Sequence, residues 1–166
     1  LALLDEEGYA GELSLIAVWT ADVYTVWFFA NGGTFTVPAD AIYGITFYAA
    51  DQTTEVTAEN QSQKPAVYFT MKVQYGTVPN PPVALDAPQQ NGFIFLGWRD
   101  SNYAILDVVT SADQYSEQSP IVAYWTEGKY SITFVTNGGT AISDITDVLY
   151  GADLSALLEN RITERD

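Results

Sequence analysis

Residues 130–140 have the sequence Tyr-Ser-Ile-Thr-Phe-Val-Thr-Asn-Gly-Gly-Thr, and a close variant, Tyr-Thr-Val-Trp-Phe-Phe-Ala-Asn-Gly-Gly-Thr, occupies residues 24–34. In each copy apolar side chains recur at every second position, which is typical of a β-strand. The Asn-Gly-Gly that follows predicts a turn, because asparagine and glycine tolerate positive φ. We therefore expect a fold built by repetition of a strand and its turn.

A second motif recurs at the same distance along the chain. Residues 17–20 are Ala-Val-Trp-Thr and residues 123–126 are Ala-Tyr-Trp-Thr, each at the end of an apolar run that predicts a strand, 13–20 and 121–126. The spacing between the two copies is 106 residues (125 − 19), the same as between the two copies of the first motif (130 − 24). Two motifs at one spacing indicate an internal repeat.

Composition excludes several classes of function. Of the 166 residues, 48% are hydrophobic and 14% aromatic, which favours a folded chain rich in β-strands over a disordered one. The formal charge of −15 disfavours nucleic acid as a partner. The absence of cysteine and histidine removes thiol and imidazole catalysis and the usual zinc ligands, so we expect no cofactor or metal. No apolar run is long enough to predict a membrane span, and the start at Leu1 suggests a fragment of a longer protein.

The first copy of the strand carries two large aromatic side chains, Trp27 and Phe29, on the face that is polar in the second copy. Exposing both would be costly, so we expect them to be covered. Between two Tyr-Gly pairs, at 43–44 and 75–76, the segments 45–49 and 66–73 predict an inserted pair of strands around a polar loop at 51–65. This pair would enlarge the sheet or add a covering layer. Residues 41–44 align with residues 148–151. Each of these two segments is expected to form the strand that returns from its turn.

The remaining segments predict loops and short elements. Four prolines between residues 77 and 92 predict an extended loop. A strand is expected at 93–100, where Gly97 would let another backbone approach closely, and a short strand at 107–109. Asp153 would cap a helix over 153–161 with leucines on one side.

These motifs together resemble the Listeria–Bacteroides repeat, also called the internalin B-repeat. The resemblance is carried by Tyr-x-Ile-Thr-Phe-x-x-Asn-Gly-Gly-Thr, Tyr-Gly, a proline-rich crossing, Gly-Phe-x-Phe-x-Gly-Trp at 92–98 and Val-Ala-x-Trp-Thr at 122–126. It implies small β-grasp, ubiquitin-like modules in tandem, within a mainly β (at most α+β) fold. The expected units are the tail of one repeat (1–20), a complete repeat enlarged by the inserted strands (21–128) and the opening half of another (129–166). The 106-residue period exceeds the usual unit, and Arg99 follows Trp98 where an aromatic residue is common.

The resemblance also implies the expected function, a non-enzymatic spacer or adhesion module of a secreted or surface-attached bacterial protein. Its partners would be neighbouring repeats and an unidentified surface protein or glycan, and the chain would lie outside the cell. The three tryptophans of the motifs, Trp19, Trp98 and Trp125, are expected to be core or inter-module anchors.

Three alternatives depend on particular side chains. A carbohydrate-binding module would use exposed aromatics as a stacking platform: Tyr9, Trp27, Tyr103 and Tyr115. A glycosidase would need a carboxylate pair such as Asp100 and Asp107 flanking a cleft. A lysine–asparagine isopeptide crosslink would have to use one of the three lysines: Lys64, Lys72 or Lys129. No catalytic or metal-binding residue is assigned.

Overall fold

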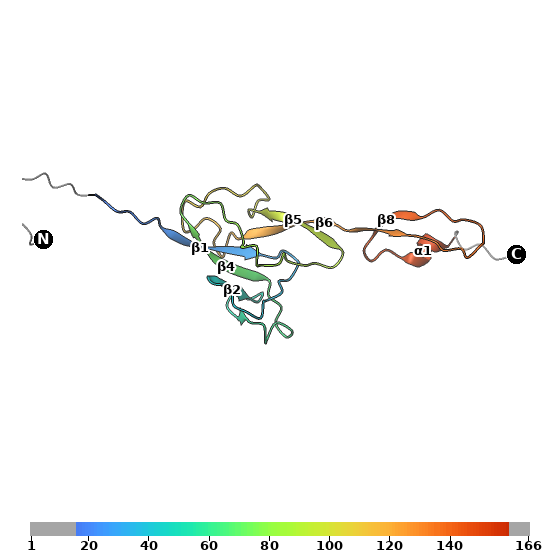
Figure 1. The fold of residues 1–166 in the computed structure, drawn as a ribbon, viewed down its shortest axis with the longest axis horizontal. Coiled ribbons are helices and arrows are strands. Elements are labelled where there is room, and N and C mark those ends of the chain that lie inside the picture. The colour runs from blue at the N-terminus through green and yellow to red at the C-terminus, as the bar shows by residue number, and fades with distance from the viewer. Residues whose placement is uncertain (1–15, 160–166) are drawn as a thin grey trace, which may run out of the picture.

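The computed structural model describes residues 16–159, and over this range the protein is mainly β, as the composition predicts. A six-stranded sheet forms the body of the molecule (Figure 1), and it is followed by a separate β-hairpin and one short helix. The strands of the sheet are β1 (Val23–Phe29), β2 (Ile45–Tyr48), β3 (Glu55–Val56), β4 (Tyr68–Gln74), β5 (Phe93–Arg99) and β6 (Ile121–Glu127).

The first strand of the repeated motif, β1, lies in the middle of this sheet, whose strand order is β3-β2-β4-β1-β6-β5. β1 pairs with β4 antiparallel along its whole length and with β6 in parallel through Phe28↔Ile121 and Phe29↔Val122. All other pairs are antiparallel. Strands inside a sheet often carry apolar residues on both faces, and the aromatic residues of β1 fit this position.

The hydrophobic core lies on one face of the sheet and is built around Phe28 and Phe69, which are fully buried and stack with their ring centroids 4.4 Å apart. Trp98 of β5 packs edge-on against both rings. Side chains from the long connections, including Val109 and Tyr115, close the core on the other side. Loops therefore cover this face of the sheet, and within residues 16–159 no helix crosses it.

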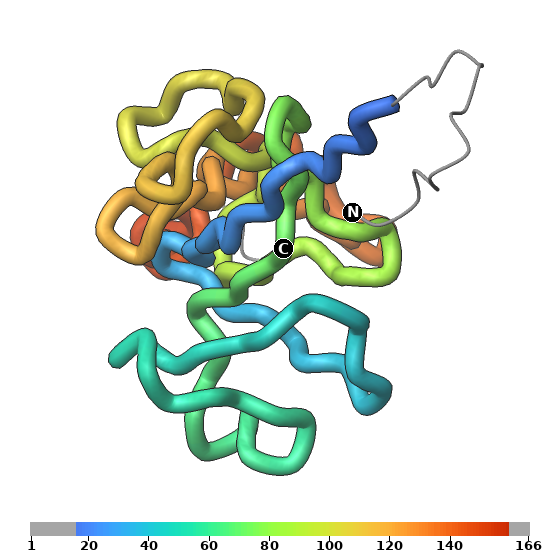
Figure 2. Tube along the Cα trace, turned by 90° about the vertical axis from the view of Figure 1, so that its left-hand side faces the viewer, coloured from blue at the N-terminus to red at the C-terminus, as the bar shows by residue number. Residues whose placement is uncertain are grey.

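The inserted segment adds β2 and β3 beyond β4 and forms a lobe that projects from the rest of the chain (Figure 2). It enlarges the sheet in its own plane, so the alternative of a separate covering layer is wrong. Trp27 and Phe29 are half-buried, as expected, but they are covered by neighbours on the same face. Trp27 lies between Tyr48 and Tyr68, with centroid distances of 5.0 and 6.2 Å, and Phe29 stacks on Tyr68 at 4.6 Å.

The second copy of the motif begins β7 (Lys129–Ile132), which forms an antiparallel hairpin with β8 (Ile145–Leu149). The hairpin and helix α1 (Leu154–Leu158) lie at one end of the long axis, beyond β5 and β6 (Figure 1). Asp153 caps the helix, as predicted, by accepting hydrogen bonds from the backbone amides of Ser155 and Ala156. The predicted end of this helix, residues 160–161, is outside the described residues.

The pairing register corrects the predicted alignment of the insertion. Tyr24 pairs with Val73 in the sheet, and Tyr130 pairs with Val148 in the hairpin. The counterpart of Tyr150-Gly151 is therefore the pair at 75–76. Residues 41–44 form no strand and end in a turn. The returning strand in the first copy is β4, and the inserted strands are β2 and β3, with β3 inside the predicted polar loop.

Three smaller predictions are also wrong. Residues 16–20 form no strand, and the rest of the predicted strand, residues 13–15, is outside the described residues. Residues 107–109 form no strand either, although Val109 exchanges backbone hydrogen bonds with Gly76 and Thr77. At Gly97 no backbone approaches. This glycine has φ of +135° where β5 is bulged, a conformation that side chains with a Cβ rarely adopt.

Candidate functional site

The two motifs that recur in the sequence bind each other in the structure. At the end of β1, the Asn31 side-chain amide donates to the backbone oxygen of Ala123 (3.0 Å). The indole N–H of Trp125 donates to the backbone oxygen of Ala30 (3.1 Å). A Cβ built on Gly33 would lie 2.7 Å from the Trp125 ring, so the ring fits only because this residue is glycine. The Asn-Gly-Gly turn at 31–33 thus forms the packing surface for Trp125 of β6.

The other copy of each motif has no such partner within residues 16–159. Trp19 is 89% exposed, although its counterpart Trp125 is half-buried. Asn137, Gly138 and Gly139 are all exposed, and a Cβ on Gly139 would meet only atoms of Thr136. Trp98 and Trp125 are therefore structural anchors, as predicted, whereas Trp19 is not a core residue in this structure.

A close contact joins the hairpin to the sheet. A Cβ built on Gly92, just before β5, would lie 2.5 Å from Cγ of Tyr150, so the Tyr150 side chain packs directly on this glycine. Gly128, the single residue between β6 and β7, donates its N–H to the oxygen of Gly92 (2.7 Å). We call this contact of Gly92 with Gly128 and Tyr150 the joint. The joint was not predicted from the sequence, although Tyr150-Gly151 and Gly92 both belong to recognisable motifs, because no sequence rule brings these two motifs together.

The four aromatics expected to form a sugar-stacking platform are not one surface. Tyr9 is outside the described residues, and Tyr115 is buried with its hydroxyl hydrogen-bonded to the backbone of Asp107. Trp27 packs between tyrosines of the sheet. Burial raises the pKa of the hydroxyl of Tyr68, one of the two tyrosines that contact Trp27. Tyr103 is the exposed member of the set.

Tyr103 has an aromatic neighbour that the sequence did not indicate. Its ring centroid lies 6.2 Å from that of Tyr124 on β6, and the Arg99 guanidinium lies 5.5 Å from the centre of the Tyr124 ring. This arrangement leaves two aromatic rings and a cation at the edge of the sheet where β5 and β6 meet.

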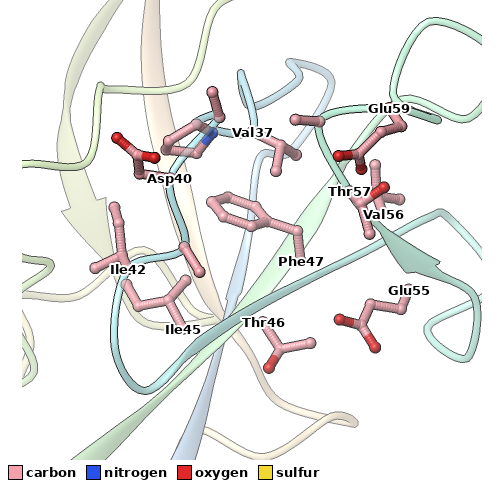
Figure 3. Close-up of a pocket in the computed structure, with 14 residues that line it drawn as sticks. Val37, Asp40, Ile42, Ile45, Thr46, Phe47, Glu55, Val56, Thr57 and Glu59 are labelled. Carbon is pink, nitrogen blue, oxygen red and sulfur yellow. The ribbon is translucent and has the colours of Figure 1, made fainter.

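The inserted lobe contains a small hollow with an apolar floor and an acidic rim (Figure 3). Phe47 lies at the centre of its lining, with Asp40 on one side and Glu59 on the other. A hydrogen bond from the Thr57 hydroxyl lowers the pKa of Glu59. The hollow measures about 230 Å³, which is smaller than typical sites for small molecules. Among the described residues, no cluster of acidic side chains is arranged to hold a metal ion.

The candidate carboxylates and lysines are engaged in local structure. Asp100 accepts hydrogen bonds from the backbone amides of Asn102 and Ala104, which fixes a turn, and the Asp107 carboxylate accepts from the amide of Val108. The amine of Lys72 donates to Thr25 (2.6 Å), and that of Lys129 pairs with Asp147 (2.9 Å). Lys129 lowers the pKa of Asp147, first through the hydrogen bond and then through its charge. An isopeptide crosslink would need an asparagine beside the lysine amine, whereas Lys72 contacts Thr25 and Lys129 contacts Asp147. The backbone amide of Lys64 bonds to Asn60 within the lobe.

Two relatives from the bacterium Evansella cellulosilytica are similar to the chain. One, named "Putative Gly-rich membrane protein", is 25% identical over 143 residues, and the other, named "Putative membrane protein", is 27% identical over 143 residues. Each match covers 86% of this chain, but the chain spans only 12% and 16% of the two relatives' lengths. No family model matches the chain, and no solved structure matches it significantly. Within residues 16–159, no helix is both long and apolar enough to cross a membrane.

Proposed function

We propose that the chain is a non-enzymatic spacer and adhesion segment of a bacterial cell-surface protein, made of modules that follow one another end to end. The observation that carries this proposal is that the hairpin repeats the strand register and the turn conformation with which the sheet begins. The pairs Tyr24↔Val73 and Tyr130↔Val148 occupy the same register. Asn31 and Asn137 both have φ of +48°, so the turns also share a backbone conformation.

The strand order supports a β-grasp-like module. The four strands β4-β1-β6-β5 place the first and last strands of the module side by side and parallel, with an antiparallel strand outside each. This is the order of a ubiquitin-like sheet. The loops that contribute Val109 and Tyr115 to the core take the place of its helix. On this proposal the module runs from β1 to β6, and β2 and β3 are an insertion at its edge.

The relatives support a location at the cell envelope. Both are named as membrane proteins, and in each the matching region is a small part of a long chain. A small part of a long envelope protein is the setting in which a spacer module acts. Consecutive modules joined by a single residue, as β6 and β7 are joined by Gly128, would extend such a protein by stacking.

The location is tested by labelling intact cells that express the protein with antibodies raised against residues 16–159. We expect labelling without permeabilisation and its loss after brief protease treatment of intact cells. A cytoplasmic protein serves as the control and should be labelled only after permeabilisation. If this chain behaves like that control, the proposed function is wrong.

Glycan contact is a second candidate, favoured by the exposed pair Tyr103 and Tyr124 with Arg99 beside it. Sugars stack on aromatic faces and accept hydrogen bonds from guanidinium groups. A glycan array probed with the whole chain tests this candidate. We expect any signal to fall at least about tenfold in Tyr103→Ala, which corresponds to the loss of one stacking contact of ~1.4 kcal/mol. A blank array would exclude this candidate and leave adhesion to protein contacts.

A further inference from the structure

The central module carries a second copy of the tyrosine that forms the joint. Register places Tyr75 at the position of Tyr150, because Gln74 pairs with Val23 as Leu149 pairs with Lys129. The glycines that follow, Gly76 and Gly151, have φ of +79° and +76°. The backbone at the two tyrosines therefore follows the same path.

Within residues 16–159, Tyr75 has no counterpart of Gly92 to pack on. Its side chain is 53% exposed, and Val23, which pairs with the preceding residue Gln74, is 55% exposed. An open hollow of about 620 Å³ begins at the same end of the sheet; its lining is mainly apolar, with Val23, Tyr43, Met71 and Pro82 among its members, and also includes Lys72 and Asn80. Residues 16–20, which carry exposed Ile16, Val18 and Trp19, lead into this end. The front end of the module is thus an apolar surface next to an exposed apolar segment, which is unusual for a surface with no partner.

We propose that this surface, centred on Tyr75, binds the Asn-Gly turn of a preceding copy of the same module, as Tyr150 binds Gly92 in the present chain. Three observations favour this occupant over an unrelated protein. The joint between sheet and hairpin shows the contact already made once. Residues 17–20 repeat the sequence of the last strand that would end such a module. The relatives are about five to seven times as long as this chain, since the 143 matched residues make up 16% and 12% of their lengths, which leaves room for further modules.

The linker is compatible with this geometry. Asp22 occupies the position of Gly128 in the joint, and its backbone oxygen accepts a hydrogen bond from Tyr75 (2.8 Å). A Cβ at position 128 would lie 3.0 Å from the oxygen of Gly92. Accommodating Asp22 in a joint of the same geometry therefore requires a shift of a few tenths of an ångström.

The test is a chain in which residues 22–127 occur twice in succession, with all other residues kept. The sequence contains no cysteine, so a spin label can be placed on single introduced cysteines. The reference pair is Asn91→Cys with Leu149→Cys in the present chain, which spans the observed joint. The test pair is Asn91→Cys in the front copy with Gln74→Cys in the back copy. All three positions are exposed.

We expect one narrow distance distribution for the test pair, with a mean close to that of the reference pair. Tyr75→Ala in the back copy should broaden the distribution severalfold, whereas Tyr103→Ala, which removes an exposed tyrosine far from the linker in sequence, should not change it. The inference rests on the proposed tandem function, so folding of the front copy is checked first by cooperative unfolding with doubled amplitude. A front copy that does not fold overturns both proposals. A folded front copy with a broad distribution, or one insensitive to Tyr75→Ala, overturns the joint and leaves the spacer function standing.

Discussion

The two Asn-Gly-Gly turns have the same backbone but very different surroundings. At the end of β1 the turn at 31–33 contacts Trp125 and Ala123, and β1 itself is paired on both edges, with β4 and with β6. In the hairpin the turn at 137–139 is exposed, and the strand before it pairs on one edge only. Local sequence therefore determines the turn, whereas burial depends on strands supplied from elsewhere in the chain.

The repeated Ala-x-Trp-Thr motif also depends on neighbouring strands for its burial. Residues 121–127 form β6 because β1 and β5 flank them, and Ala123 is fully buried there. Residues 16–20 repeat the motif without flanking strands and are exposed. A strand exists only when its hydrogen bonds and apolar face find partners. The comparison can be tested by making the same change in both copies.

The largest difference is expected for the phenylalanine in the middle of the repeated strand. Phe28 is fully buried and stacked on Phe69, so Phe28→Ala should reduce the free energy of unfolding by about 3–5 kcal/mol. Phe134, at the same position in the second copy, is half-buried in the hairpin. Phe134→Ala should change the unfolding of the sheet by less than about 1 kcal/mol. Urea unfolding followed by tryptophan fluorescence measures both, and equal losses would contradict the comparison.

The second-largest difference in stability is expected between the alanine variants of Trp125 and Trp19. Trp125→Ala removes the hydrogen bond to Ala30 and the packing on Gly33, and because this ring is half-buried we expect a loss of about 2–3 kcal/mol. Trp19→Ala removes a ring that is 89% exposed and should change stability by less than about 0.5 kcal/mol. Thermal unfolding by calorimetry separates the two cases. A clear loss in the Trp19 variant would mean that this ring packs on the module in solution.

A smaller difference is expected at the second glycine of each turn. A Cβ at Gly33 would meet the Trp125 ring and the backbone oxygen of Gln89, both at 2.7 Å, and the backbone cannot move aside cheaply. Gly33→Ala should therefore cost about 1–3 kcal/mol. In Gly139→Ala the added Cβ would approach the oxygen of Thr136 at 3.2 Å and its Cβ at 3.8 Å, so the change should cost less than about 0.5 kcal/mol. The pair is compared in urea, and a costly Gly139→Ala would show that the second turn is also occupied.

Much of the fold follows from sequence patterns within single segments. Alternation of apolar residues predicted β1, apolar segments predicted the strands that became β2, β4, β5 and β6, and the cap of α1 followed from Asp153. The alignment of Tyr43-Gly44 with Tyr150-Gly151 was wrong for a physical reason. Both Tyr-Gly pairs of the central module match the motif equally well, and only pairing with β1 shows that the returning strand is the one ending at Tyr75.

The contacts that form the candidate site were harder to predict. The sequence showed that Asn-Gly-Gly and Ala-x-Trp-Thr recur together, but their mutual contact depends on β6 lying parallel to β1. The carbohydrate-binding alternative placed Tyr115 on the surface, yet its ring is buried in the core and its hydroxyl is hydrogen-bonded to the backbone of Asp107. Aromatic residues with a polar tip occur both in protein cores and on surfaces, and only tertiary packing decides between the two positions.

The inserted lobe has no counterpart after the second copy of the motif. The smallest expected effect is a pKa change within this lobe. The Thr54 hydroxyl donates to the Asp51 carboxylate (2.6 Å), and with the backbone amides of Thr54 and Thr53 it lowers the pKa of Asp51 from 3.8 to about 2. A lowered pKa favours the folded lobe above about pH 4, and this contribution is lost as the pH falls towards 2. In an NMR titration of the carboxyl carbons, Thr54→Val should raise the pKa of Asp51 towards 3.8. Thr53→Val keeps the backbone amide and removes only the Thr53 hydroxyl, which contributes least to the lowered pKa. This change should leave the pKa of Asp51 nearly unchanged. An unaltered pKa in Thr54→Val would show that the loop of the lobe is not held by this hydroxyl.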